Sequence, residues 1–230
     1  MGEWRPGEWY DDGGWMGPKK YAPRWPANWA TVRFLAQAKK ILELGGTDAA
    51  VLDLGSGNGM FAAMLWHQGH RGRYMGFDFS PGSLADAVEG NKNQGGHQQA
   101  VFELCDLEQA NVTDLLDEYD MPLSTVVTTG ECLEHMKNDR RIVSTIPEGT
   151  ICVVTLPRFD AEAHIRWWYE QRDLAWYWKP FFAGWQQEWI AHRCRDPERQ
   201  CHMFWGARNG FEWAGDTWEG AVVAPPGWEP

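Results

Sequence analysis

Short apolar runs alternate with helical patterns between residues 50 and 156, and this alternation constrains the fold more than any other feature of the chain. The sequence predicts strands over 50–54, 73–77, 100–105, 124–129 and 150–156, and helices over 60–68, 81–91, 107–119 and 132–146. Strands that alternate with helices form a parallel sheet covered by helices on both faces. Two further predicted strands, 185–191 and 202–207, are expected to pair as an antiparallel hairpin at the edge of that sheet.

The whole pattern predicts an α/β fold: a Rossmann-like three-layer α/β/α sandwich whose seven-stranded sheet is mostly parallel, with an antiparallel C-terminal strand. A length of 230 residues fits one domain, 1–230. We expect an N-terminal arm rich in Trp, Gly and Pro over 1–26, a core over 27–208 and an irregular tail over 209–230. Asn28 is a candidate cap for a helix that stops at Gly45 and Gly46.

Composition limits where the protein works and what it binds. The net charge is −11, from 32 acidic and 21 basic residues, which disfavours nucleic-acid binding. No apolar run approaches the ~20 residues that span a bilayer, and the N-terminus lacks the pattern of a secretory signal. The five cysteines form no CxxC pair, which indicates free thiols in a reducing cytoplasm. The oligomeric state is left open by the sequence.

A glycine-rich turn follows the first predicted strand and opens the next helix. It contains Asp53, Gly55, Ser56, Gly57, Asn58 and Gly59. Ligands of such sheets bind beyond the carboxyl ends of the strands, where glycines let the backbone approach closely. A nicotinamide fingerprint would have GxGxxG, whereas this loop has GxGxG. The spacing therefore disfavours an NAD-dependent dehydrogenase.

Acidic residues end the next two predicted strands. Asp78, followed by Phe79, ends the second strand 19 residues after Gly59. A carboxylate at that place can accept hydrogen bonds from both hydroxyls of a ribose, so a nucleotide cofactor with a free 2′-hydroxyl is implied. Asp106, followed by Leu107, ends the third strand.

These features together resemble the core of class I S-adenosylmethionine-dependent methyltransferases over residues 50–156. The run Thr129-Gly130-Glu131-Cys132-Leu133-Glu134-His135 resembles the fourth-strand motif of ubiquinone-pathway-like O-methyltransferases. The resemblance implies that the glycine loop holds the amino-acid end of the donor and that Asp106 accepts from the adenine amino group, with the Leu107 backbone at the ring edge. The implied set of cofactor-binding residues is Asp53, Gly55, Ser56, Gly57, Asn58, Gly59, Asp78, Phe79, Asp106, Leu107 and Thr129.

The acceptor side has four candidate residues. Glu131, Glu134 and His135 have i, i+3, i+4 spacing, which places them on one face of a helix, and His164 follows the fifth strand. Three readings stay open: a divalent metal such as Mg²⁺ or Mn²⁺ bound by Glu131, Glu134, His135 and His164, a metal-free base, or a structural role. The metal arrangement resembles that of methyltransferases acting on the terminal ribose of small RNAs. Catalysis is assigned to His135, Glu131 and His164.

Three further groups have competing explanations. A zinc site formed by His192, Cys194, Cys201 and His202 has suitable residue types but no known spacing. An aromatic run within a predicted helix over 161–178 and just beyond it forms either an acceptor pocket or plain core; it contains Trp167, Trp168, Tyr169, Trp176, Tyr177, Trp178, Phe181 and Phe182. Three arginines, Arg158, Arg166 and Arg172, either bind an anionic acceptor or pair with Asp160, Glu162 and Asp173.

The leading hypothesis is a methyltransferase that acts on an oxygen, less readily a nitrogen, of a small aromatic or sugar-like acceptor. A metal-assisted enzyme acting on a nucleic-acid end is the second hypothesis. The third is a non-catalytic module with the same fold, against which the intact glycine loop and Asp78 speak.

Overall fold

Seven strands form one sheet in the order β3-β2-β1-β4-β5-β8-β7. The computed structural model describes residues 29–93, 99–159, 163–190, 200–212, 220–224, 226 and 228. The strands of the sheet are β1 (Val51–Leu54), β2 (Tyr74–Asp78), β3 (Ala100–Leu104), β4 (Val126–Gly130), β5 (Ile151–Pro157), β7 (Phe182–Ile190) and β8 (Cys201–Arg208). β1 to β5 run parallel, and β8 lies antiparallel to both β5 and β7. The predicted α/β sheet with its antiparallel C-terminal strand is confirmed.

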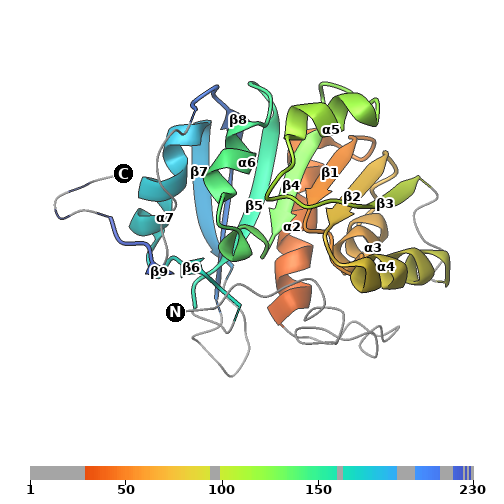
Figure 1. Ribbon diagram of the computed structural model, residues 1–230, viewed down its shortest axis with the longest axis horizontal. Helices are drawn as coiled ribbons and strands as arrows, with labels where there is room; N and C mark the ends of the chain where they lie inside the picture. Colours follow the sequence, from red (N-terminus) through yellow and green to blue (C-terminus); the bar gives the residue numbers. More distant parts are fainter. Residues whose placement is uncertain are drawn as a thin grey trace.

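Helices cover both faces of this sheet, as Figure 1 shows. They are α2 (Trp29–Gly45), α3 (Met60–His67), α4 (Pro81–Asn93), α5 (Val112–Glu118), α6 (Asp139–Ser144) and α7 (Gln171–Trp178), with short 3₁₀ turns η2 (Leu133–His135) and η3 (Lys179–Phe181). One apolar core lies under α2 and α3, and a second lies under α5, α6 and α7. None of the described helices is long and apolar enough to cross a membrane.

The two cores follow from the side-chain alternation of the strands. Val51 packs with Phe34 and Ile41 in the core under α2, whereas Leu52 and Leu54 pack in the opposite core. Successive residues of a strand point to opposite faces, so a central strand that is buried on both sides needs a continuous apolar run. Asp53 breaks that run on the α2 side, and it lies directly at the cavity described below.

Two predicted helices between residues 107 and 146 differ from the structure. The range 132–146 is not one helix, because η2 ends at His135, the next residue Met136 has an extended backbone (φ −93°, ψ 136°), and α6 starts only at Asp139. The helix predicted over 107–119 begins later, at Val112. The Asn111 side chain accepts hydrogen bonds from the Thr113 and Asp114 amides and so caps α5 at this point.

The predicted helix over 161–178 is also too long. Residues 166 and 167 instead form β6 (Arg166–Trp167), and α7 begins at Gln171. β6 pairs in parallel with β9 (Gly220–Ala221), so part of the predicted irregular tail is a strand docked on the core. The arm over 1–26 and Asn28 lie outside the described residues, and the division into arm, core and tail stays a prediction.

Candidate functional site

A cavity opens at the carboxyl edge of the sheet, where parallel strands of such folds bind ligands. Nine of the eleven predicted cofactor residues line it: Asp53, Gly55, Ser56, Gly57, Asn58, Asp78, Phe79, Asp106 and Leu107. Gly59 does not line it and instead caps α3, with a left-handed φ of 75°. Thr129 is buried in the sheet, where its carbonyl accepts a hydrogen bond from Gln37. The three predicted motifs therefore meet at one place.

The glycine loop has a backbone conformation that requires glycine at two positions. Gly55 and Gly57 have φ angles of 80° and 51°, a left-handed region that favours glycine. A Cβ at Gly55 would lie 2.5 Å from the Cys132 sulfur, so a side chain there would collide with the loop after β4. The amides of Gly55 and Ser56 both donate to the Phe77 carbonyl, which fixes the loop against β2.

Asp78 connects this loop to the end of β2. Its Oδ2 accepts a hydrogen bond from the Gly57 amide at 2.8 Å, and its Oδ1 accepts one from the Ser80 amide at 3.0 Å. Asp78 is 8% exposed and lines the cavity. Carboxylate oxygens have about four lone-pair sites, so these two contacts can coexist with hydrogen bonds from a ligand.

Asp53 lies deeper in the same cavity and is 2% exposed. The Tyr74 hydroxyl donates a short hydrogen bond to its Oδ2. Burial raises the pKa of Asp53 to about 7, although the Tyr74 hydrogen bond and the nearby charge of Arg33 both lower it. A buried carboxyl that titrates near neutral pH can form an ion pair with an ammonium group once it is charged.

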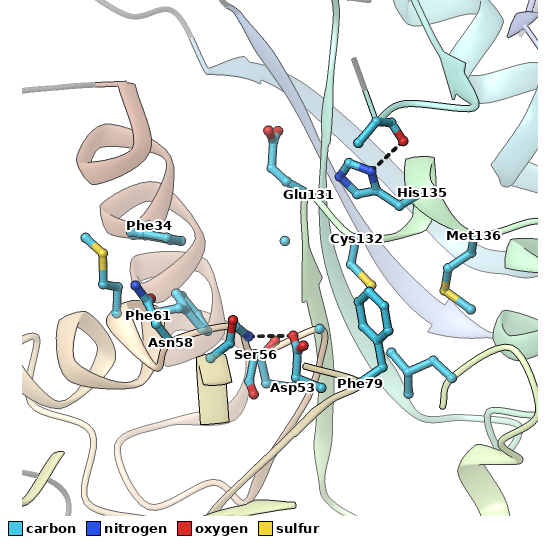
Figure 2. Close-up of a pocket in the computed structure, with 18 of the residues that line it drawn as sticks. Phe34, Asp53, Ser56, Asn58, Phe61, Phe79, Glu131, Cys132, His135 and Met136 are labelled. Carbon is cyan, nitrogen blue, oxygen red and sulfur yellow. Dashed lines mark hydrogen bonds between the residues drawn. The ribbon is translucent and has the colours of Figure 1, made fainter. Parts of the chain in front are cut away.

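The other side of the cavity is formed by the segment after β4. Glu131, Cys132, His135 and Met136 line it, and Figure 2 shows His135 and Met136 across the cavity from Phe34 and Phe61. Glu131 has a left-handed backbone with φ 58°, which is uncommon for a residue with a side chain. Its Oε1 accepts a hydrogen bond from the Cys201 thiol at 3.1 Å. The strained turn thus presents a carboxylate to the space next to the glycine loop.

Two histidines and a glutamate meet at this wall, and one of them, His135, lines the cavity itself. The ring Nδ1 of His135 lies 2.8 Å from the Ala163 carbonyl, and the Nδ1 of His164 lies 3.0 Å from the Phe159 carbonyl. A carbonyl only accepts, so both Nδ1 atoms carry the proton and both Nε2 atoms carry a lone pair. These Nε2 atoms lie 3.8 and 3.9 Å from the same Oε1 of Glu134, too far for hydrogen bonds.

The predicted set of metal ligands is therefore only partly brought together. Glu134, His135 and His164 offer ligand atoms within 4.8 Å of one another, and Glu131 is outside this group. The carboxylate of Glu134 is fully buried, and neither oxygen accepts a hydrogen bond from the described part of the chain. Burial, and next the charge of Glu131, raises the pKa of Glu134 well above its usual range. Burial, together with His164, lowers the pKa of His135 to about 3.

The structure also places a helix at the cavity that sequence reasoning missed. Arg33, Phe34 and Gln37 of α2 line it, at a spacing that puts Arg33 and Gln37 on one side of the helix. Both polar side chains are buried, at 2% and 1% exposure. The signal was available in the sequence: a positive charge and an amide interrupt the apolar face of the helix at i and i+4.

A family model described as a methyltransferase domain matches residues 46–189, which is more than half of the chain. This chain belongs to that family: it is a class I S-adenosylmethionine-dependent methyltransferase. The matched segment contains the glycine loop, Asp78, Asp106 and the wall after β4. A comparison with curated protein sequences finds no significant match.

Solved structures share the fold of this methyltransferase. Magnesium protoporphyrin IX methyltransferase from Synechocystis PCC 6803, with bound S-adenosylmethionine, has a TM-score of 0.56 at 13% identity over 78% of this chain and 80% of its own. A phosphoethanolamine N-methyltransferase from Haemonchus contortus has a TM-score of 0.53 at 15% identity, over 76% of this chain and 52% of its own. The [4+2]-cyclase SpnF has a TM-score of 0.55 at 15% identity, over 76% of this chain and 80% of its own. These proteins differ in chemistry, so the likeness shows the fold alone.

Of the two explanations for the aromatic run, the positions of its described residues favour core packing. Trp168, Tyr177, Trp178 and Phe181 are buried in the core under α7, and no member of the aromatic run lines the cavity. Their rings pack against one another and against Phe204, as expected for residues of an apolar core. The aromatic residues that do face the cavity come from other elements: Phe34, Phe61 and Phe79.

Two of the three candidate arginines have acidic partners within the described residues. Arg166 is fully buried and pairs with Asp139 at 2.7 Å. Arg158 pairs with Glu170 at 3.5 Å and donates to Gln200. Arg172 is exposed on α7, and none of the three lines the cavity. Asp160 and Glu162, expected as partners, lie outside the described residues.

The proposed zinc cluster cannot be followed in full, since His192 and Cys194 lie outside the described residues. The two members that are described have other contacts. Cys201 donates to Glu131, and the Nε2 of His202 lies 2.7 Å from the Trp168 carbonyl. They are neighbours in β8, so their side chains point to opposite faces of the sheet.

Proposed function

We propose that this methyltransferase transfers the methyl group to a hydroxyl oxygen of a small-molecule acceptor. The observation that supports it best is the wall after β4, where Glu131 and His135 face the same cavity as the glycine loop. The apolar rings of Phe34 and Phe61 lie opposite and suit a flat or aromatic acceptor. The net charge of −11 disfavours a polyanionic one.

The proposed donor contacts follow the lining of the cavity. The Asp78 carboxylate accepts from the ribose hydroxyls, and Asp106 with Leu107 holds the adenine edge. Asp53 and the loop from Gly55 to Asn58 receive the amino-acid end. This order places the sulfonium methyl toward the wall that contains Glu131.

The reaction is an in-line displacement, for which the protein mainly aligns the two partners. The acceptor oxygen attacks the methyl carbon, the carbon–sulfur bond breaks, and its electron pair returns to sulfur, which leaves as a neutral thioether. The acceptor loses its hydroxyl proton. We assign that proton to Glu131, because its carboxylate belongs to a residue that lines the cavity, whereas the Nε2 of His135 lies 3.8 Å from Glu134. An amine acceptor would have less need of such a base, which favours oxygen over nitrogen.

We further propose that Glu134, His135 and His164 hold a divalent cation. The Nε2 atoms of both imidazoles face the Glu134 carboxylate, and each Nδ1 lies within hydrogen-bond distance of a backbone carbonyl. Histidines that bind a metal usually donate their other ring N–H to such an acceptor. The mixed imidazole and carboxylate set favours Mn²⁺ over Mg²⁺. When bound, such a cation would lower the pKa of an acceptor hydroxyl.

A second candidate function rests on this same group of residues. A metal next to the acceptor could hold the terminal diol of a nucleic acid, and a metal-dependent activity on RNA or DNA ends would support it. The acidic charge of the chain opposes it. We also propose a cytoplasmic location, supported by the free thiols of the four described cysteines, Cys105, Cys132, Cys152 and Cys201.

The test is a transfer assay with radiolabelled donor and a panel of catechols, phenols, sugars, amines and short RNAs, each with Mn²⁺, Mg²⁺ or chelator. We expect label on a small hydroxyl compound and at least a tenfold loss in Glu131→Gln. His164→Gln should abolish Mn²⁺ binding measured by calorimetry, whereas His67→Gln, an exposed histidine on α3, should not. Label found only on amines or only on RNA ends would contradict the proposal.

A further inference from the structure

Glu131 is held from two strands that are distant from it in the sequence. It directly follows β4, and its amide donates to the Thr155 carbonyl of the neighbouring strand β5 at 3.0 Å. Its Oε1 accepts a hydrogen bond from the Cys201 thiol at 3.1 Å. Cys201 is the first residue of β8, the strand on the other side of β5. The backbone of Glu131 is thus tied to β5 and its carboxylate to β8.

We propose that Cys201 is a positioning residue that orients the carboxylate of Glu131 for the acceptor. The inference rests on the proposed function, in which Glu131 receives the proton of the acceptor hydroxyl. In this arrangement the thiol keeps its own proton and holds Oε1, and the acceptor's proton passes to Oε2. Cys201 itself touches neither the donor nor the acceptor.

The second carboxylate oxygen of Glu131 is the one that is available to a ligand. Glu131 is 5% exposed and lines the cavity, and its Oε2 has no hydrogen-bond partner within the described residues. A buried polar atom without a partner costs free energy, so folded proteins keep few of them. A hydroxyl group of the acceptor would supply the missing hydrogen bond and would then be placed to give up its proton.

The position of Glu131 in the chain explains why its side chain needs an anchor. The residue lies between the end of β4 and the start of η2, with a left-handed φ of 58°. A glutamate side chain has several rotamers, and their freedom is lost when the group is fixed. A hydrogen bond at the end of the side chain selects one rotamer before the acceptor arrives, so the acceptor does not have to supply that ordering.

A thiol suits this task because it is a weak donor. Cys201 is 2% exposed, and burial, and next the charge of Glu131, raises the pKa of its thiol well above the usual range. The thiol therefore stays protonated and donates. A lysine or arginine at this place would form a charge-assisted hydrogen bond and make the carboxylate a poorer proton acceptor. The weaker S–H donor orients the carboxylate and leaves it able to take a proton.

Replacement of Cys201 tests the proposal through the rate of transfer to the acceptor that the transfer assay identifies. Cys201→Val removes the donor and should lower kcat about 10- to 100-fold, while the KM for S-adenosylmethionine stays within about twofold of the parent. Cys201→Ser restores a donor and should recover kcat to within about threefold of the parent. Cys152→Val changes another buried cysteine of the sheet, outside the cavity, and should keep the parental kcat.

The hydrogen bond can also be tested without an acceptor. The infrared S–H stretching band of Cys201 is the difference between proteins with and without Cys201→Ser. In Glu131→Gln this band should move to higher frequency, because a neutral amide oxygen is a weaker acceptor than a carboxylate. The band of Cys152, whose thiol donates to the Thr150 carbonyl, should stay in place.

Three results would overturn the proposal. The first is a Cys201 band that does not move in Glu131→Gln. The second is a Cys201→Val variant with parental kcat although Glu131→Gln has lost activity. The third is an equal loss of kcat and donor binding in both Cys201→Val and Cys201→Ser, which would show that the residue serves only the fold. If Glu131→Gln itself keeps the parental kcat, the assignment of the proton to Glu131 is contradicted, and the task of Cys201 falls with it.

Discussion

The Asp78 carboxylate holds the glycine loop, and we propose that it binds the donor's ribose at the same time. It holds the Gly57 amide at 2.8 Å and the Ser80 amide at 3.0 Å while it faces the cavity. Its exchange should therefore disturb both the loop and the proposed ribose contact. The position of Asp78 at a strand end predicted the ribose contact. Its hydrogen bonds to the loop amides could be found only from the three-dimensional structure.

Asp78→Asn should weaken donor binding about 100-fold, because two charge-assisted hydrogen bonds to the ribose lose their acceptor charge. Circular dichroism should show an intact fold. Asp117→Asn, an exposed carboxylate on α5, is the matched control and should bind the donor like the parent. If the Asp78→Asn variant kept parental affinity, the ribose contact would have to be removed from the account.

Donor binding should depend on pH through Asp53. Burial raises the pKa of Asp53 to about 7, so the carboxyl becomes neutral as pH falls below 7 and loses its attraction for the donor's ammonium. The donor's own amino group stays protonated in that range, since an α-amino pKa is about 7.7–8.0. We expect affinity to fall by up to about tenfold per pH unit between about pH 7 and 5.5.

Asp53→Asn is the control for this pH dependence. The variant should bind more weakly than the parent at about pH 8 and show a flat profile between about pH 5.5 and 7. A parent profile that is flat over the same range would show that the ionisation of Asp53 does not matter for the donor.

At the scale of elements, the turn after β4 departs most from sequence expectation. A continuous helix over 132–146 would have placed Glu131, Glu134 and His135 on one face. The left-handed backbone at Glu131 and the extended backbone at Met136 break that helix into η2 and α6. As a result Glu131 lines the cavity, whereas Glu134 is fully buried and meets His135 and His164. The spacing of residues along a helix cannot predict where the backbone leaves the helical conformation.

The backbone strain at Glu131 can be measured. Glu131→Gly should be more stable than Glu131→Ala by about 1 kcal/mol, because glycine adopts a positive φ without steric cost and both variants lose the same carboxylate. Urea denaturation gives the difference, and both variants should lose transfer activity. Equal stabilities would mean that the turn is not strained.

For the other elements the sequence was a good guide, for a physical reason. The central strands after residue 50 are buried on both sides, so each appears as a short apolar run between glycines and polar turns. Most of the proposed donor-binding residues could be predicted to lie close together, because they follow the carboxyl ends of neighbouring strands. Arg33 was missed because the polar interruption of its helix does not indicate which part of the protein it faces, and that is set by packing on β4 and β5.

At the scale of the molecule, a buried ion pair joins the catalytic core to the segment after β5. Arg166 of β6 pairs with Asp139 of α6 at 2.7 Å, and the Tyr177 hydroxyl donates to the same carboxylate. Arg166 also donates to the carbonyls of Met136 and Lys137. The cavity wall at Met136 is thus fixed from β6, a contact between distant parts of the sequence that no local pattern indicates.

Arg166→Met should destabilise the protein by about 3–5 kcal/mol, because it leaves the Asp139 carboxylate buried without its cation. The double variant Arg166→Met with Asp139→Leu should recover much of that loss, since it removes both charges together. Thermal denaturation of the three proteins measures the effect. A single variant as stable as the parent would show that the pair contributes nothing.

Calorimetric titration of the parent protein and Asp78→Asn with S-adenosylmethionine and its demethylated product tests the central claim most directly. The account predicts micromolar binding of both ligands to the parent and about 100-fold weaker binding to the variant. A parent that binds neither ligand, or a variant that binds both as tightly as the parent, would contradict the placement of the donor in this cavity.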